Sequence, residues 1–234
     1  MPRLPHQKFK GKSTMGPRGD AIAQVDFVVG EIMKSVEKHG IAANTMLIFT
    51  SDNGPVLNDG YEDFSVEKLG NHNPSGPFRG GKYSIYESGT RVPTIVYWKG
   101  KIIPLVSNAL LSQVDFYSSF AALVGQKVPA NVLDSKNHLT SLTGEDKKGR
   151  DQLLEEAGTL ALRIGDWKYI KPSKYEKHFL WVTTKGIESG IMDKAQLFNL
   201  RDDPSEQVNL ADKYPEKVKE LHKELERIEN RGGS

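Results

Sequence analysis

Apolar side chains recur every three or four residues between Ile22 and Val36, which is the spacing of one buried face of an α-helix. Asp20 precedes this run and is a residue type that caps helix N-termini, and Gly40 follows it and is typical of a helix end. The pattern therefore predicts a helix between Asp20 and Gly40. Residues 1–19 contain several prolines and glycines, which predict a loop.

Two short, continuously apolar runs, at residues 45–50 and 94–98, predict strands. A strand that is apolar on both faces is typical of a buried parallel sheet. A helix followed by such a strand forms half of a βαβ unit, and residues 112–124 show the spacing of a further helix. We therefore predict an α/β fold for residues 1–125, in the form of part of a doubly wound sheet.

The pattern changes after residue 125. A polar connection at 125–152 leads to three short β-prone runs at 159–163, 167–170 and 196–199. Gly165 and Asp166 separate the first two runs and indicate a hairpin, and an amphipathic helix follows Pro215. Residues 126–234 are thus predicted to form a connection and a smaller α+β subdomain, with an antiparallel sheet and a terminal helix.

Composition limits the classes of function. The 32 basic and 30 acidic residues give a net charge of +2, which does not favour nucleic-acid binding. The chain has no cysteine, which excludes disulfides, zinc–thiolate sites and cysteine nucleophiles. No apolar run approaches the roughly 18 residues of a membrane span, and we expect neither membrane insertion nor a secretory signal in this chain.

The strand predicted at 45–50 ends in Asp52 and Asn53. Open α/β folds place their sites at the carboxyl ends of such strands, and carboxylate and amide oxygens suit a hard divalent cation. The alternative is an Asx turn without a metal, since Asn-Gly is a common turn dipeptide.

Three further residues in the long polar loop at 55–81 and just beyond it could bind an anion. Lys82 follows Gly80 and Gly81, which would let the backbone approach a ligand closely, and Arg79 is near enough to share the patch. His72 could bind substrate or donate a proton. For Lys82 and His72 the alternative is an ordinary solvated side chain, and a loop this long in a compact domain is usually functional or disordered.

Four segments in order along the chain resemble type I sulfatases, the arylsulfatase family of the alkaline-phosphatase-like superfamily. Residues 44–55 resemble the family's second metal-binding segment, and residues 76–93 resemble the lysine-bearing segment that follows it. Residues 162–169 resemble the hairpin of the C-terminal subdomain. Residues 197–210 resemble its last strand and the approach to the final helix.

The resemblance implies a sulfuric ester hydrolase with one calcium ion, held by two aspartates of the N-terminal part and by an Asp-Asn pair. Asp52 and Asn53 match that pair, so the ligand set within this chain is incomplete. Lys82 matches the lysine that contacts the sulfate group and is the catalytic residue we carry over. The family's nucleophile is a formylglycine made from the Cys or Ser of a C/S-x-P-x-R motif, which we expect to lie outside this chain.

We therefore expect a C-terminal portion of a sulfatase that is inactive without the missing N-terminal half. One alternative is a non-catalytic binding or structural module, and another is a phosphate-ester or phosphonate hydrolase of the same superfamily. The expected substrate is a sulfated carbohydrate or an aryl sulfate, with residues 58–73 lining its pocket. On the basis of the resemblance to this family, we expect the complete enzyme to be periplasmic or secreted.

Overall fold

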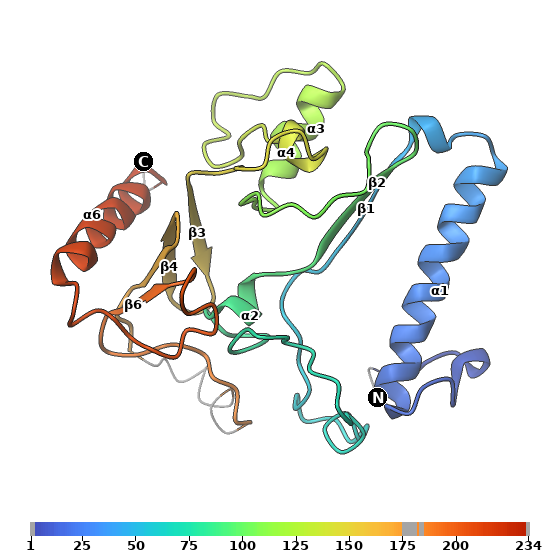
Figure 1. Cartoon of the computed structure of the whole chain (residues 1–234), viewed down its shortest axis with the longest axis horizontal. Helices are drawn as coiled ribbons and strands as arrows, with labels where there is room; N and C mark the ends of the chain where they lie inside the picture. The colour runs from blue at the N-terminus through green and yellow to red at the C-terminus, as the bar shows by residue number, and fades with distance from the viewer. Residues whose placement is uncertain (1–2, 175–181, 183–184, 233–234) are drawn as a thin grey trace.

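The computed structural model describes residues 3–174, 182 and 185–232. Figure 1 shows α1 and the β1–β2 pair towards one end of the molecule and the second sheet with α6 at the other, with α2 between them. The helices and strands are η1 (Gln7–Phe9), α1 (Gly16–Lys38), η2 (Ala42–Asn44), β1 (Met46–Thr50), α2 (Glu87–Thr90), β2 (Thr94–Trp98), α3 (Asp115–Leu123), α4 (Leu139–Leu142), β3 (Gln152–Glu156), β4 (Leu160–Ile164), β5 (Trp167–Ile170), β6 (Gln196–Asn199) and α6 (Pro215–Gly232).

Helix α1 begins before Asp20, so the prediction of Asp20 as its cap is wrong. The helix starts at Gly16, and Pro17 occupies its first turn, where a missing N–H costs no hydrogen bond. Asp20 is buried within the helix, and its carboxylate accepts hydrogen bonds from the Gly11 and Ser13 amides, each at 2.8 Å. This carboxylate therefore holds the preceding loop against the helix.

Strand β1 pairs with β2 in an antiparallel direction, from Met46 opposite Trp98 to Thr50 opposite Thr94. The prediction of a buried parallel strand is therefore wrong for the pairing that the described residues form. The side chains of Phe49 and Ile95 are 40% and 61% exposed, so this pair is not buried on both faces either. A run of apolar residues indicates that a segment tends to be buried, but it does not show whether the strand pairs in a parallel or an antiparallel direction.

The second sheet has the antiparallel order β3-β4-β5-β6 and confirms the predicted subdomain. Successive side chains point to opposite faces, so Leu162 and Tyr169 pack against α6, whereas Ala161 and Ile170 pack against the segment that leads into α2. The sheet thus lies between α6 and the α2 region (Figure 1). The sequence pattern did not predict β3.

Helices α3 and α4 lie against each other between the two sheets (Figure 1). Asp115 at the start of α3 forms a bidentate ion pair with Arg150, with both N–O distances at 2.6 Å. A bridge between Leu110 and Gly149 runs alongside it. These contacts cross the boundary predicted between residues 125 and 126, which stays a prediction.

No helix in the described part of the chain combines the length and the apolar character needed to cross a membrane.

Candidate functional site

Asp52 and Asn53 lie in the loop directly after β1. The Asn53 side-chain amide donates to the Gly54 carbonyl at 2.9 Å, and Asp52 Oδ1 accepts the Asn53 backbone amide at 3.0 Å. An Asx turn would require the Gly54 amide to donate to Asp52, but this amide donates to the Gly89 carbonyl at 2.9 Å instead. The predicted alternative of an Asx turn is therefore wrong.

A crossing of two backbone segments brings Asp52 and Asn53 towards Lys82. The Lys82 amide donates to the Pro55 carbonyl at 2.8 Å, one residue beyond the Gly54–Gly89 bond. A Cβ at Gly54 would collide with the carbonyl oxygen of Ser88, and a Cβ at Gly81 would stand 2.6 Å from the Pro55 oxygen. Only glycine permits this approach, so the loop after β1 and the loop before α2 are fixed to each other through main-chain contacts.

The side chain of Lys82 is half-buried and lines a cavity of ≈ 380 Å³. Its ammonium lies 5.2 Å from the centre of the Tyr83 ring, within the range of a cation–π contact. Asn58 also lines the cavity, which supports the expectation that the segment at 58–73 contributes to it. The opposite wall consists of residues 185–188, so the cavity joins two parts of the chain that lie far apart in sequence.

Arg79 and His72 are not among the described residues that line this cavity. The Arg79 guanidinium donates to Glu188 Oε2 at 2.8 Å and to the Glu206 carbonyl at 2.8 Å, and it stacks on the Tyr86 ring. The hydrogen bond to Glu188 raises the pKa of Arg79 above its ordinary value. His72 is exposed on a turn of the long loop. Substrate binding by Arg79 and His72 stays a prediction.

The lysine-bearing loop rests on a buried cluster of charges where α2 meets the second sheet. Lys168 on β5 lies 3.0 Å from both Glu87 and Glu155 and 3.3 Å from Glu206. Burial opposes the charge of Lys168, but these carboxylates outweigh it and raise the lysine's pKa. Burial likewise opposes ionisation of Glu87, yet Lys168 lowers its pKa, whereas burial raises the pKa of Glu206 to about 7.

Arg91 joins the rim of this cluster as an ion-pair partner of Glu87. Its guanidinium lies 3.6 Å from Glu87 and stacks on the Phe78 ring. Arg91 therefore joins the two ends of the 78–91 segment to each other, and Glu87 ties the segment to β5 through Lys168.

The spacing Ser-x-Pro-x-Arg does occur once in the chain, from Ser75 to Arg79. It lies inside the segment that resembles the family's lysine-bearing motif, and the Ser75 hydroxyl, which borders the cavity, donates to the Gly80 carbonyl at 3.3 Å. The Arg79 side chain is bound to Glu188 and Glu206.

Asp52 and Asn53 fit a hard cation by the kind of ligand atom they offer. Asn53 uses its amide nitrogen on Gly54, which leaves the amide oxygen as the donor towards a cation. Within residues 3–174, 182 and 185–232, no group of three or more His, Asp or Glu side chains is placed to hold an ion. The pair therefore fits a hard cation in the chemistry of its oxygen atoms, and binding of calcium stays a prediction.

Comparisons with known proteins agree with this geometry. The Sulfatase family model matches residues 2–126. N-acetylgalactosamine-6-O-sulfatase of Bacteroides thetaiotaomicron is 46% identical over 99% of this chain and 45% of its own length, and arylsulfatase A of Bos taurus is 30% identical over 97% and 45%. A solved structure from work on glycosaminoglycan metabolism by B. thetaiotaomicron superposes with a TM-score of 0.94 at 45% identity, over 98% of this chain and 48% of that one.

The fold and the paired loops define a member of the alkaline-phosphatase-like superfamily. Within that superfamily, the chain belongs to the sulfatase family. It spans about half the length of the curated relatives it matches.

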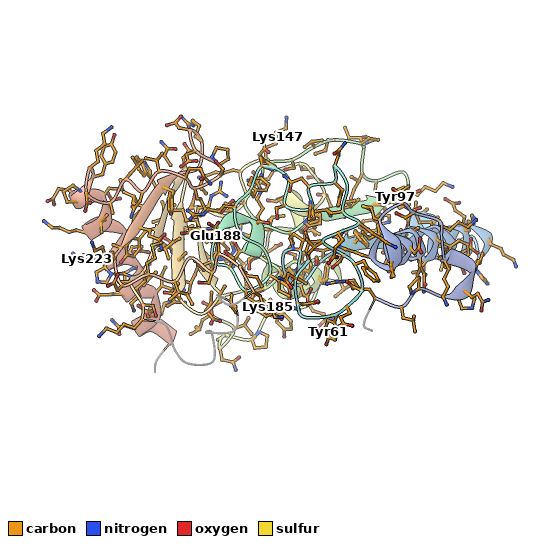
Figure 2. The ribbon with its side chains drawn as sticks, turned by 90° about the horizontal axis from the view of Figure 1, so that it is seen from below. Tyr61, Tyr97, Lys147, Lys185, Glu188 and Lys223 are labelled. Carbon is orange, nitrogen blue, oxygen red and sulfur yellow. The ribbon has the colours of Figure 1, made fainter. Side chains whose placement is uncertain are left out.

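Sequence reasoning missed the wall of the cavity formed by Lys185 and Glu188. Figure 2 places both residues in the middle of the molecule, between the α6 end with Lys223 and the α1 end with Tyr97. The Lys185-Gly186 dipeptide signals a turn, but no spacing connects it to Lys82, which lies 103 residues earlier in the chain. Only the packing of α2 on the second sheet brings these two loops together.

Proposed function

We propose that the protein hydrolyses sulfate esters of sulfated glycans, and that this chain supplies the sulfate-contacting lysine and half of the cation site. The observation that carries the proposal is the glycine crossing, which fixes the loop of Asp52 and Asn53 to the loop of Lys82 through main-chain contacts. Lys82 lines the cavity, whereas the cavity lining on the other loop begins at Pro55, two residues after Asn53. The relatives reported above are sulfatases, which favours sulfate esters over phosphate or phosphonate esters as substrates.

In this proposal, Lys82 stabilises the negative charge that builds on the sulfuryl oxygens as the ester bond breaks. Its ammonium is a compact point charge, and the partly buried setting strengthens its attraction to an anion. Arg79 would act indirectly, because its contacts to Glu188 and Glu206 hold the loop that carries Lys82.

Asp52 and Asn53 would hold a calcium ion together with ligands from outside this chain. The ion would supply charge stabilisation at the sulfate oxygens when it is bound. We infer that the remaining ligands and the formylglycine nucleophile belong to an N-terminal half like that of the longer relatives. We also propose a periplasmic or secreted location for the complete enzyme.

The substrate proposed is a sulfated amino-sugar glycan. Support comes from the name of the 46% identical relative, N-acetylgalactosamine-6-O-sulfatase. The ≈ 380 Å³ cavity lies within the volume range of small-ligand sites and can enclose about one sugar ring.

The test is a chimera in which the N-terminal part of the Bacteroides relative is joined to this chain. We expect the chimera to release sulfate from N-acetylgalactosamine-6-sulfate in the presence of calcium. Lys82→Met should lower kcat by about 100-fold or more, because one charge-stabilising donor contributes that much in comparable sites. Chelation should abolish turnover, and added calcium should restore it.

Lys147→Met serves as the matched control, because Lys147 is an exposed lysine away from the cavity (Figure 2). Unfolding midpoints of all variants establish that each one is folded. A Lys82→Met chimera that keeps its kcat within threefold of the parent contradicts the proposal. Ser75→Ala should retain activity, because the proposal places the nucleophile in the N-terminal part.

A further inference from the structure

One wall of the cavity comes from the C-terminal subdomain and carries a second lysine. Lys185 lines the same cavity as Lys82, although the two residues lie far apart in the sequence. The Asn58 side chain donates to the Lys185 carbonyl at 3.3 Å, which joins the two walls at the backbone. Lys185 is thus held beside the cavity by a contact to the segment that follows the Asp52–Asn53 loop.

The tip of Lys185 reaches across Gly60. Its Nζ lies 3.3 Å from the position that a Cβ at residue 60 would occupy, and Gly60 has a φ of +92° that other residues rarely adopt. Glycine at this position leaves the space through which the lysine extends. The side chain is half-buried and does not simply trail into solvent.

The acidic groups around the cavity already have cationic partners. Glu188 lines the cavity but pairs with Arg79 at 2.8 Å, and Asp59 pairs with Arg3 at 2.8 Å. Among the described residues, no carboxylate lies within 4 Å of the Lys185 ammonium. Among the described residues that line the cavity there are two lysines and one carboxylate, that of Glu188, which is already paired with Arg79.

We propose that Lys185 binds a second anionic group of the substrate, so that the enzyme prefers sulfated sugars that carry another carboxylate or sulfate beside the ester that is cleaved. This inference rests on the proposed function and assigns Lys185 as a specificity-determining residue outside the reacting centre. A carboxylate is a planar oxyanion and a sulfate is a tetrahedral one, and the lysine ammonium can bind either of them as a point charge. A carboxylate would come from a neighbouring uronic acid, whereas a second sulfate would come from the same sugar.

The experiment compares three probes on the chimera described above. The first is N-acetylgalactosamine-6-sulfate, with one anionic group. The second is a disaccharide of the same sulfated sugar with a uronic acid, and the third is the 4,6-disulfated monosaccharide. Dissociation constants are measured by isothermal titration calorimetry, and KM and kcat are measured for sulfate release.

Lys185→Met should weaken binding of one or both doubly charged probes by about tenfold, the cost of one charge-assisted hydrogen bond, and leave the singly charged probe unchanged. The affected probe identifies the second anion as a carboxylate or a sulfate. Lys185→Arg keeps the charge and should restore the preference. Lys223→Met, an exposed lysine at the α6 end, is the matched control (Figure 2).

The inference is overturned if Lys185→Met changes all three affinities equally or changes none of them. Binding is measured separately from turnover, so the inference and the proposed function fail independently. An inactive chimera that still loses doubly charged probes on Lys185→Met contradicts the proposed hydrolysis alone. An active chimera with an unaffected Lys185→Met variant contradicts only the role of Lys185.

Discussion

Glu206 is a buried carboxylate that links the lysine-bearing loop to the second sheet. Its Oε2 accepts the Glu87 amide at 2.6 Å, its Oε1 lies 3.3 Å from Lys168, and its backbone has a φ of +53°, which is uncommon for a residue other than glycine. Burial raises its pKa from 4.5 to about 7, and Lys168 only partly opposes this effect. Glu206 is therefore poised to titrate near neutral pH.

This raised pKa predicts a stability that declines as pH rises. Between the unfolded pKa of 4.5 and the folded pKa of about 7, the folded chain binds more protons than the unfolded chain. The free energy of unfolding should fall by roughly 1–3 kcal/mol from this group between pH 5 and pH 8. Glu206→Gln keeps an oxygen for the Glu87 amide and should flatten that dependence.

The measurement is thermal unfolding of parent and variant at pH 5.5 and pH 8. Glu156→Gln is the control, because Glu156 is an exposed carboxylate on strand β3 of the same sheet. If Glu206→Gln loses as much stability between the two pH values as the parent does, the assignment of this slope to Glu206 is refuted.

At the residue scale, the sequence allowed us to choose candidate residues by their chemistry, but it did not show which side chains surround them in the fold. Asp52, Asn53 and Lys82 follow from a strand end and a glycine pair, and the structure brings their loops together. The segment around Glu206 is a tight turn, in which the Asp203 carboxylate accepts the Val208 amide at 2.8 Å. No local pattern could show that Glu206 turns inward, because its partners Glu87 and Lys168 are distant in sequence.

At the scale of elements, helix α3 is anchored by one buried ion pair. Asp115 is 1% exposed, and its carboxylate accepts two hydrogen bonds from Arg150 and others from the Ser112 and Lys136 amides. Burial opposes the charge of Asp115, but Arg150 and these amides outweigh it and lower its pKa. The pair joins α3 to the chain just before β3.

Arg150→Met should lower the free energy of unfolding by about 3 kcal/mol, because it leaves the Asp115 charge buried without its partner. Urea unfolding at pH 7 provides the measurement. Lys148→Met removes the exposed pair between Lys148 and Asp151 two residues earlier and should leave the midpoint unchanged. Equal shifts of the unfolding midpoint in both variants would show that the buried pair contributes no more to stability than the exposed pair.

The sequence pattern predicted most elements and the antiparallel second sheet, but the predicted parallel direction of β1 was wrong. The strands at 46–50, 94–98, 160–164, 167–170 and 196–199 agree with the predicted runs to within a residue, and the hairpin at Gly165 is confirmed. Strand β3 escaped prediction because Leu153-Leu154 and Glu155-Glu156 do not alternate. Its inward-facing Glu155 is compensated by Lys168, a tertiary contact that period-two patterns do not report.

At the scale of the whole molecule, an apolar face remains uncovered at the α1 end. Ile22, Val25, Val28 and Ile32 on α1 are 45–49% exposed, and Ile95 on β2 is 61% exposed. Exposed apolar surface of this kind marks an interaction site. Figure 1 shows α1 beside the β1–β2 pair at the end of the molecule opposite α6.

We expect the N-terminal half of a longer sulfatase to cover this face. Val25→Glu should reduce the tendency of the chain to aggregate and should prevent its association with the N-terminal part of the Bacteroides relative supplied as a separate polypeptide. Val208→Glu, at a 59% exposed valine elsewhere, is the matched control. Size-exclusion chromatography of each mixture measures both effects, and association that persists in Val25→Glu contradicts the assignment of this face.

The glycine crossing between the loops at 54–55 and 81–89 has a consequence for how such a protein can diversify. Because main-chain atoms set the separation of these loops, substitutions of neighbouring side chains leave it unchanged as long as Gly54 and Gly81 are kept. The wall at 185–188 is held to the crossing segments by the side chains of Asn58, Ser84 and Arg79, so it can vary without disturbing the main-chain contacts of the crossing. Substitutions are thus poorly tolerated at the glycine crossing, whereas the facing wall at 185–188 can change and so alter which ligands the cavity accepts.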